Sequence, residues 1–182
     1  MVYLPSACQL VLAVIVIVAG IYDILYRRIP NWLTLTGVLI GFGLNSFLFE
    51  INGLRSAALG LGIALLIYFP LYLLRGMGAG DVKLMGAVGS IAGPANWLVI
   101  FIVTNLLGGV VAVILLVAKK RLLKTFSNVI YMIKEMLLLR PPYLKKEELD
   151  VHHTGAVTLP HGVMIAAGTI AYLAAAAIWA SR

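Results

Sequence analysis

The chain has 182 residues, which fits one domain, and 62% of them are hydrophobic while only 12% are charged. Soluble globular chains are about half apolar and about a quarter charged, so this composition excludes both an ordinary soluble fold and a disordered chain. The formal net charge of +7 would suggest a nucleic acid partner in a soluble protein. In a membrane protein, an excess of positive charge instead indicates which loops face the cytoplasm, so no nucleic acid partner is expected. The single Cys8 excludes an internal disulfide and a cysteine-based zinc site.

Uncharged runs mark the segments that could cross a membrane: Met1 to Tyr22, Trp32 to Phe49, Ser56 to Leu74, Leu84 to Ala118 and Thr154 to Ser181. A transmembrane helix needs about 20 mostly apolar residues, so the fourth run is too long for one span. A turn signal, Gly93-Pro94-Ala95-Asn96, divides it into a short helix (Asp81 to Ala92) and a full one (Trp97 to Val117). The sequence therefore predicts an all-α integral membrane protein, a single domain over residues 1–182, with six transmembrane helices of which the fourth is short.

The distribution of positive charge agrees with six spans. If the N-terminus faces outward, only Arg55 and Arg182 of the 14 Lys and Arg residues lie outside. Counting Leu84 to Ala118 as one span would move residues 119–150 outside and reverse this bias. Because short cytoplasmic loops carry an excess of Lys and Arg, we expect six spans in the cell membrane with both termini outside.

The segment from 119 to 151 is the one sizeable stretch that does not span. Apolar residues recur in it at helical spacing, with basic residues between them: Leu122, Phe126, Val129, Ile130, Ile133 and Leu137. This pattern predicts a basic amphipathic helix that lies on the inner membrane surface, with membrane lipid as its partner. Pro141-Pro142 would end it.

Asp23 and Asp81 are the only acidic residues tied to predicted spans, and both fall at the inner membrane edge. The other acids lie in the outer loop or the inner segment: Glu50, Glu135, Glu147, Glu148 and Asp150. Each aspartate alone could be a boundary residue, with Asp23 pairing with Arg27 and Asp81 capping a helix. Together, two carboxylates that share one proton can activate water and protonate a leaving amine, which is the chemistry of aspartic proteases.

Glycines surround Asp81, in the turn Gly76-Met77-Gly78-Ala79-Gly80 that enters the fourth helix. Gly78 and Gly80 could allow an extended substrate to approach the backbone, or simply form a tight turn. Lys83 could stabilise an ionised Asp81 or act only as a positive-inside anchor. Near Asp23, Pro30 is suited to starting the second helix.

Three segments together resemble the type IV prepilin peptidases of the GxGD class of membrane aspartyl proteases. They are Asp23 with Ile29-Pro30-Asn31, then Gly78-Ala79-Gly80-Asp81-Val82-Lys83, and finally Leu159-Pro160-His161-Gly162-Val163. In the last segment His161 stands where the family usually has Tyr, and Val163 where it usually has Pro. The resemblance covers nearly the whole chain, which is similar in size to the short peptidases of tight-adherence (Flp) pilus systems and to archaeal preflagellin peptidases.

The resemblance implies that Asp23 and Asp81 are catalytic, that no metal or cofactor is used, and that the substrate is a pilin-like precursor whose short basic leader is cut at the cytoplasmic face. Residues expected to support the site are Gly78, Gly80, Lys83, Pro30 and Asn31. Larger bifunctional members insert a Cys-rich cytoplasmic segment between the first two spans and also methylate the new N-terminus. Here a few residues separate those spans and there is no Cys pair, so we expect peptidase activity without methyltransferase activity.

Two other classes of function fit parts of the pattern. A small proton- or cation-coupled transporter could use the two aspartates as ion sites and the glycine-rich break as an interrupted helix. It would place the acids near mid-membrane, whereas these lie at one edge. A non-catalytic membrane subunit of a secretion system is the other alternative.

The remaining polar and small residues favour structural roles. Adjacent His152 and His153 rarely chelate a metal alone, and His161 could either line the site or pack. Asn45 and Asn105 are expected to bond to neighbouring helices rather than to substrate, and the spacings Gly37/Gly41 and Gly89/Gly93 predict helix-packing faces.

Overall fold

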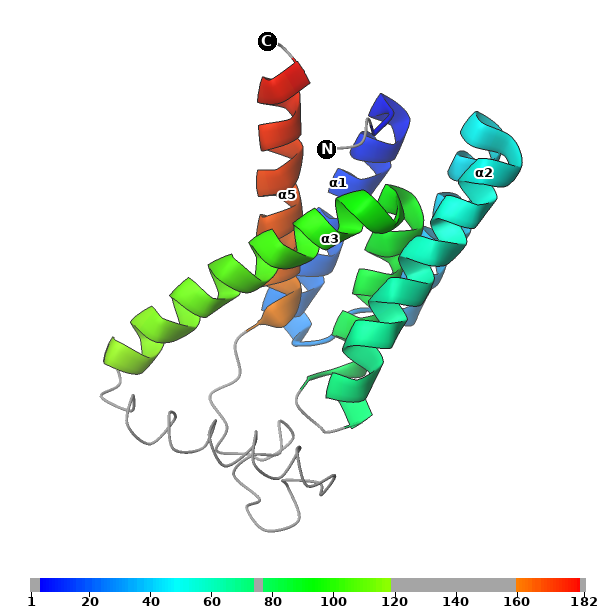
Figure 1. The fold of residues 1–182 in the computed structure, drawn as a ribbon. Helices are drawn as coiled ribbons and strands as arrows, with labels where there is room; N and C mark the ends of the chain where they lie inside the picture. Colours follow the sequence, from blue (N-terminus) through cyan, green and yellow to red (C-terminus); the bar gives the residue numbers. More distant parts are fainter. Residues whose placement is uncertain (1–3, 74–76, 119–159, 181–182) are drawn as a thin grey trace.

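The computed structural model describes residues 4–73, 77–118 and 160–180, and the regular elements in these ranges are α-helices (Figure 1). In chain order they are α1 (Ser6–Tyr26), α2 (Asn31–Leu73), α3 (Ala79–Ala118) and α5 (His161–Ala180). All four are long and apolar enough to cross a membrane. The predicted all-helical fold is confirmed, whereas the six separate helices are not, because the described ranges contain four.

The difference arises because α2 and α3 each run through a backbone break where the sequence predicts two helices. In α2 the break is at Glu50 (φ 52°, ψ −133°), and in α3 it is at Gly93 (φ 73°, ψ 171°), followed by Pro94. Beyond the first break the chain of α2 turns back on itself (Figure 1), which brings Gly53 against the carbonyl group of Asn45. A single residue in an unusual conformation therefore replaces each expected loop, at the places where the sequence predicts a turn or loop.

The first half of α3 forms the centre of the molecule. It is buried almost continuously from Val82 to Gly93, and α3 contacts each of α1, α2 and α5. Small residues permit this burial: a Cβ placed on Gly60 of α2 would collide with the carbonyl group of Gly89, and one on Gly89 would collide with that of Gly60. Close backbone approach through small residues is how helices associate within membranes.

The predicted glycine faces are confirmed at these contacts. A Cβ on Gly37 would lie 3.0 Å from the Ala87 Cβ, Gly41 lies against Ser90, and Gly93 lies against the Ser56 hydroxyl. All of these contacts join α2 to α3.

Asn45 bonds between helices, as the sequence predicts. Its Nδ2 donates hydrogen bonds of 3.0 Å to the Ser90 carbonyl and 3.1 Å to the Ile91 carbonyl, just before the break in α3. Asn105 donates to the Phe101 carbonyl of its own helix, at 2.7 Å.

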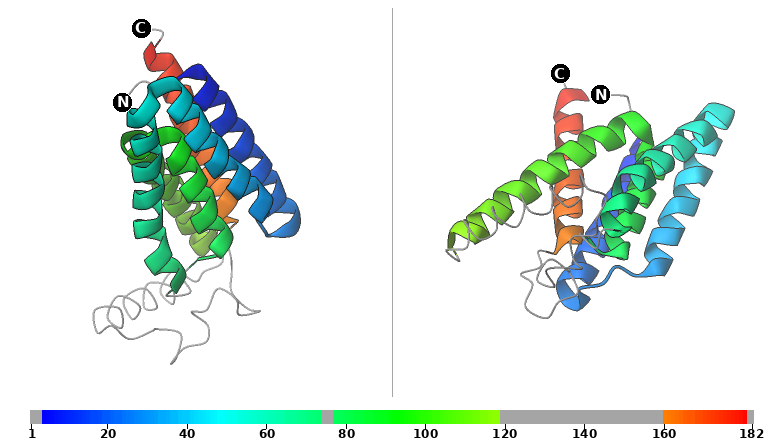
Figure 2. Two further views of the ribbon diagram at one scale, coloured as in Figure 1. Left: turned by 90° about the vertical axis from the view of Figure 1, so that its right-hand side faces the viewer. Right: turned by 60° about the horizontal axis from the view of Figure 1, so that its bottom comes forward.

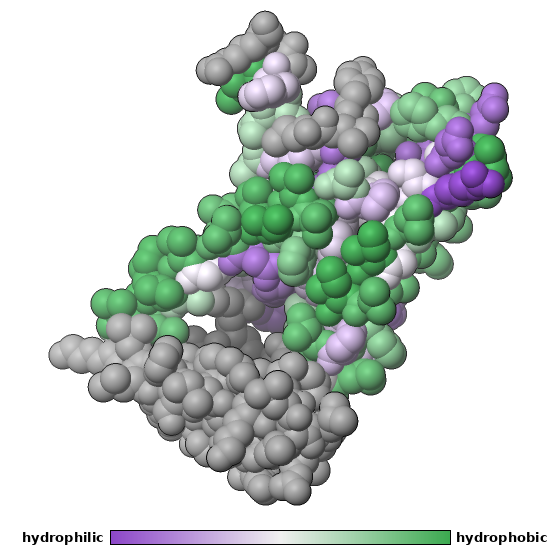
Figure 3. All heavy atoms as spheres, viewed as in Figure 1, coloured by the Kyte–Doolittle hydropathy of each residue, from purple (hydrophilic) through white to green (hydrophobic). Residues whose placement is uncertain are grey.

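Large apolar side chains cover the outer faces of the bundle, as Figure 3 shows for one side. On α3 they follow the second half of the helix: Leu98, Ile102, Leu106, Val110, Val113, Ile114 and Val117. An apolar surface of this extent suits contact with lipid rather than water. The predicted amphipathic segment from 119 to 151 lies outside the described residues.

Several helix ends meet at one end of the bundle. The end of α1, both ends of α2 and the starts of α3 and α5 lie there, opposite the labelled chain termini (Figures 1 and 2). This arrangement brings the end of α1, with Asp23, and the start of α3, with Asp81, to the same end of the molecule.

Candidate active site

Asp23 lies in the last turn of α1 and is buried, with only 8% of its surface exposed. Helix α1 ends directly after it: Arg27 takes a left-handed conformation and its N–H donates to the Asp23 carbonyl at 3.0 Å. The carboxylate faces the start of α5, where the backbone N–H of Val163 donates to its Oδ2 at 3.3 Å. A buried carboxylate needs such donors, because desolvation without compensation is costly.

Asp81 lies in the first turn of α3 and is half-buried. Its backbone N–H donates to the Gly78 carbonyl at 3.2 Å, which closes the predicted glycine turn. Its carboxyl group is near enough to that of Asp23 for the two charges to repel each other. The structure thus brings together the two acidic residues that the sequence singled out.

Ile29 packs against the starts of two helices, α3, which carries Asp81, and α5. A Cβ added to Gly80 would lie 3.2 Å from the Ile29 Cβ, and one added to Gly162 would lie 3.0 Å from the Ile29 Cδ1. Both glycines therefore leave room for the side chain of Ile29. At Gly78 a Cβ would make only ordinary contact, 3.4 Å from Asp81 Oδ2.

Pro30 and Asn31 form the start of α2, as predicted. Pro30 directly precedes the helix, and its carbonyl accepts a hydrogen bond from the Thr34 N–H at 3.4 Å. Asn31 Oδ1 accepts a 2.8 Å hydrogen bond from Lys83 Nζ. Lys83 therefore links the first turn of α3 to the first turn of α2, a role that neither sequence interpretation of this residue included.

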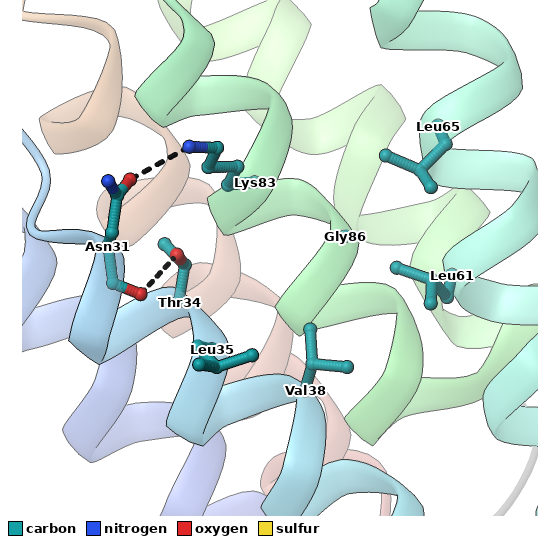
Figure 4. Close-up of a pocket in the computed structure, with 8 residues that line it drawn as sticks. All are labelled: Asn31, Thr34, Leu35, Val38, Leu61, Leu65, Lys83 and Gly86. Atoms are coloured by element: carbon teal, nitrogen blue, oxygen red, sulfur yellow. Dashed lines mark hydrogen bonds between the residues drawn. The ribbon is translucent and has the colours of Figure 1, made fainter.

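A pocket of about 410 Å³ lies beside this link, between the two halves of α2 and the start of α3 (Figure 4). Asn31 and Lys83 lie at one side of it, and most of the wall is apolar: Leu35, Val38, Leu61 and Leu65. Neither aspartate lines the pocket, so it is a neighbouring space and not the dyad itself.

The start of α5 contributes groups that the sequence identified only in part. His161 is half-buried near Asp23, and its Nε2 has no hydrogen-bond partner among the described residues. The Val163 N–H bonds to Asp23 and Gly162 leaves room for it, and the sequence predicts neither as a site residue. The only feature of the sequence that points to these two residues is their place in the third resembling segment. Every residue except Pro has a backbone N–H, so residue type does not reveal which N–H contacts a carboxylate.

Nothing in the described ranges groups three or more His, Cys, Asp or Glu residues as a metal site would. His152 and His153 lie outside those ranges.

Comparison with family models gives one match, to the type IV leader peptidase family, over residues 10–113. No curated protein and no solved structure matches the chain. The matched region contains both aspartates, the Ile-Pro-Asn start of α2 and the Gly-x-Gly-Asp turn, and it covers more than half of the chain. The protein therefore belongs to the type IV leader peptidase family and is a peptidase.

Proposed function

We propose that this peptidase is an aspartic endopeptidase in which Asp23 and Asp81 form the catalytic pair. The observation that carries the proposal is that these carboxylates, which lie 58 positions apart in the chain, come near enough at one end of the bundle (Figure 1) for their charges to interact. Two neighbouring carboxylates do not readily ionise together, so the pair would hold one proton between them.

The pair supplies what hydrolysis of a peptide bond requires. The ionised carboxylate takes a proton from water as the water oxygen attacks the carbonyl carbon. The protonated carboxyl group donates first toward the carbonyl oxygen and, once the tetrahedral intermediate collapses, a proton reaches the leaving amine. The backbone at Gly78, where an added Cβ would meet only Asp81 Oδ2, offers an extended substrate room to lie beside Asp81.

The substrate that we propose is a pilin-like precursor, cut between its short basic leader and the apolar segment that follows. The membership of the family supports this class of substrate. We further propose that no methyltransferase activity accompanies cleavage. In support, α1 ends at Tyr26 and α2 begins at Asn31, so the connection between them is too short to hold a further domain.

We propose that cleavage occurs at the cytoplasmic face of the cell membrane. The breaks at Glu50 and Gly93 support six membrane-crossing segments, because a straight helix of 43 residues would be about 65 Å long, about twice the thickness of the hydrocarbon core. With six segments, both termini lie on the same side of the membrane. The positive-inside rule makes that side the outside, so the end with Asp23 and Asp81 faces the cytoplasm, where most Lys and Arg residues would lie. The segment from 119 to 151 would then rest on anionic lipid at the inner surface.

Substitution of each aspartate tests the catalytic proposal. Asp23→Asn and Asp81→Asn should each abolish leader cleavage in membranes, measured by the mass shift of a leader-bearing precursor. The double variant should be no worse than either single one, because residues that act as one unit are not additive. Asn keeps the side-chain volume, so insertion into the membrane should be unchanged.

The control is Glu50→Gln, which alters an exposed acid far from the pair and should leave cleavage at the wild-type rate. A chelator should have no effect, since the proposed mechanism uses no metal. Substantial cleavage by a well-inserted Asp81→Asn protein would falsify the aspartic mechanism. Such a result would favour a transporter or a non-catalytic secretion subunit, in which the aspartates have another role.

A further inference from the structure

The first turn of α5 lies directly against the carboxylate of Asp23. The Val163 N–H lies 3.3 Å from Asp23 Oδ2 and also 3.1 Å from the Pro160 carbonyl, so this donor is shared between two oxygens. The contact joins residues 140 positions apart. The two groups are far apart in the sequence, so only tertiary packing brings them into contact.

Gly162 is what allows this approach. A Cβ at this buried position would lie 3.0 Å from Asp23 Oδ2 and 3.1 Å from the Asp23 Cβ, closer than nearly all real Cβ contacts. It would also lie 3.0 Å from Ile29 Cδ1, so two neighbours would have to move at once. An added side chain at Gly162 would require Asp23, Ile29 or the start of α5 to shift by a few tenths of an ångström, which would disturb the contact with the Val163 N–H.

Other charged and titratable groups face Asp23 as well. Asp81 faces it from α3 and His161 from α5, and Arg27 follows it at the end of α1. The hydrogen bond from the Val163 N–H reaches the Asp23 Oδ2 from the backbone of a different helix. A donor of this kind both stabilises negative charge and fixes the rotation of the carboxylate.

We propose that Gly162 and Val163 are positioning residues, and that the Val163 backbone N–H fixes the rotation of the Asp23 carboxylate in the proposed catalytic pair. This inference rests on the aspartic mechanism proposed above.

A pair of variants at one position isolates the N–H. Val163→Pro removes the donor, and Pro is tolerated in the first turn of a helix, so the protein should still insert. Val163→Ala shortens the side chain but keeps the N–H, and it is the control for any effect of losing the valine side chain. Both are to be assayed for cleavage of a leader-bearing precursor, with kcat and KM measured separately across a range of pH.

We expect kcat of Val163→Pro to fall about threefold to tenfold below that of Val163→Ala, a modest loss because the hydrogen bond is shared. KM should stay the same in both. The acidic limb of the pH profile should move to higher pH in Val163→Pro, because the ionised form of the pair has lost a donor. A structural defect alone would lower the amount of active enzyme without moving this limb.

Equal kcat and equal pH profiles for the two variants would overturn the proposal, and so would a rise in KM alone, which would place Val163 at the substrate. If Val163→Pro does not accumulate, Gly162→Ala replaces it, with Gly109→Ala as its control because a Cβ there meets nothing within 4 Å. Equal cleavage by those two variants would also overturn it. Loss of activity in Asp23→Asn with no effect at Val163 would reject the positioning role alone, whereas an active Asp23→Asn would reject the catalytic proposal itself.

Discussion

At the scale of single residues, Lys83 shows how a local pattern can suggest the wrong partner. Two positions after Asp81, it invites either a catalytic or a topological interpretation. Its Nζ instead donates to Asn31 Oδ1 at 2.8 Å, across 52 positions of sequence. The hydrogen bond connects the turn that carries Asp81 to the start of α2, and it lies at the edge of the apolar pocket.

The effects of substituting Lys83 and Asn31 should be coupled in a double-mutant cycle. Lys83→Met keeps the apolar stem but removes the charge, and Asn31→Ala removes the acceptor. Because Lys83 is exposed, each change should slow cleavage only about twofold to fivefold, and the double variant should be no slower than the slower single variant. Initial rates on a precursor substrate measure this. Fully additive losses would mean that the two side chains act separately.

At the scale of helices, the close contact between α2 and α3 depends on two glycines whose backbones touch. Gly60 and Gly89 have no room for a Cβ, whereas Gly62, one position beyond Leu61 on the same helix, has nothing within 4 Å of such an atom. Packing therefore requires glycine at position 60 but not at position 62, and the two positions can be compared directly.

Gly60→Ala should destabilise the protein by about 1–3 kcal/mol, because the two helices must separate to accept the added methyl group. Gly62→Ala should leave stability unchanged or raise it slightly, since Ala has the higher helix propensity. Thermal unfolding in detergent measures both variants. Equal unfolding temperatures would show that α2 and α3 tolerate a wider separation than this packing implies.

At the scale of the whole molecule, the fold has two distinct ends. One carries Asp23, Asp81 and the start of α5, and the other carries the break at Glu50 and the described portions nearest both termini (Figure 1). In the orientation proposed above, which follows the positive-inside rule, the first end faces the cytoplasm. The outer faces between the two ends are apolar, as a membrane-embedded bundle requires (Figure 3).

Cysteine labelling should reveal this orientation. In a Cys8→Ala background, Asn52→Cys should react with an impermeant thiol reagent applied from outside. Arg28→Cys, exposed at the opposite end, should react only after the membrane is opened. Cleavage activity must be retained in both variants. The reverse labelling pattern would reject the proposed orientation, and labelling of both positions from outside would reject the placement of the two ends on opposite sides.

Several features of this protein follow from the sequence by itself. Long uncharged runs determine the all-helical fold, because a chain in lipid must satisfy its backbone hydrogen bonds internally. The Gly93-Pro94 pair locates the break in α3. Acidic residues are scarce, and ionisable groups near the membrane core are energetically costly and usually functional, so Asp23 and Asp81 can be predicted as candidate site residues.

Tertiary structure alone decided the rest. Whether a turn becomes a loop or a one-residue break depends on the packing of the two halves of α2 against α3, as at Gly60 and Gly89. The contact of α5 with Asp23 is invisible in the sequence, because a backbone N–H has no residue-specific signature and its acceptor lies 140 positions away. The sequence shows which charged and polar side chains are costly to bury. Only the packed helices determine which distant hydrogen-bond donors offset that cost.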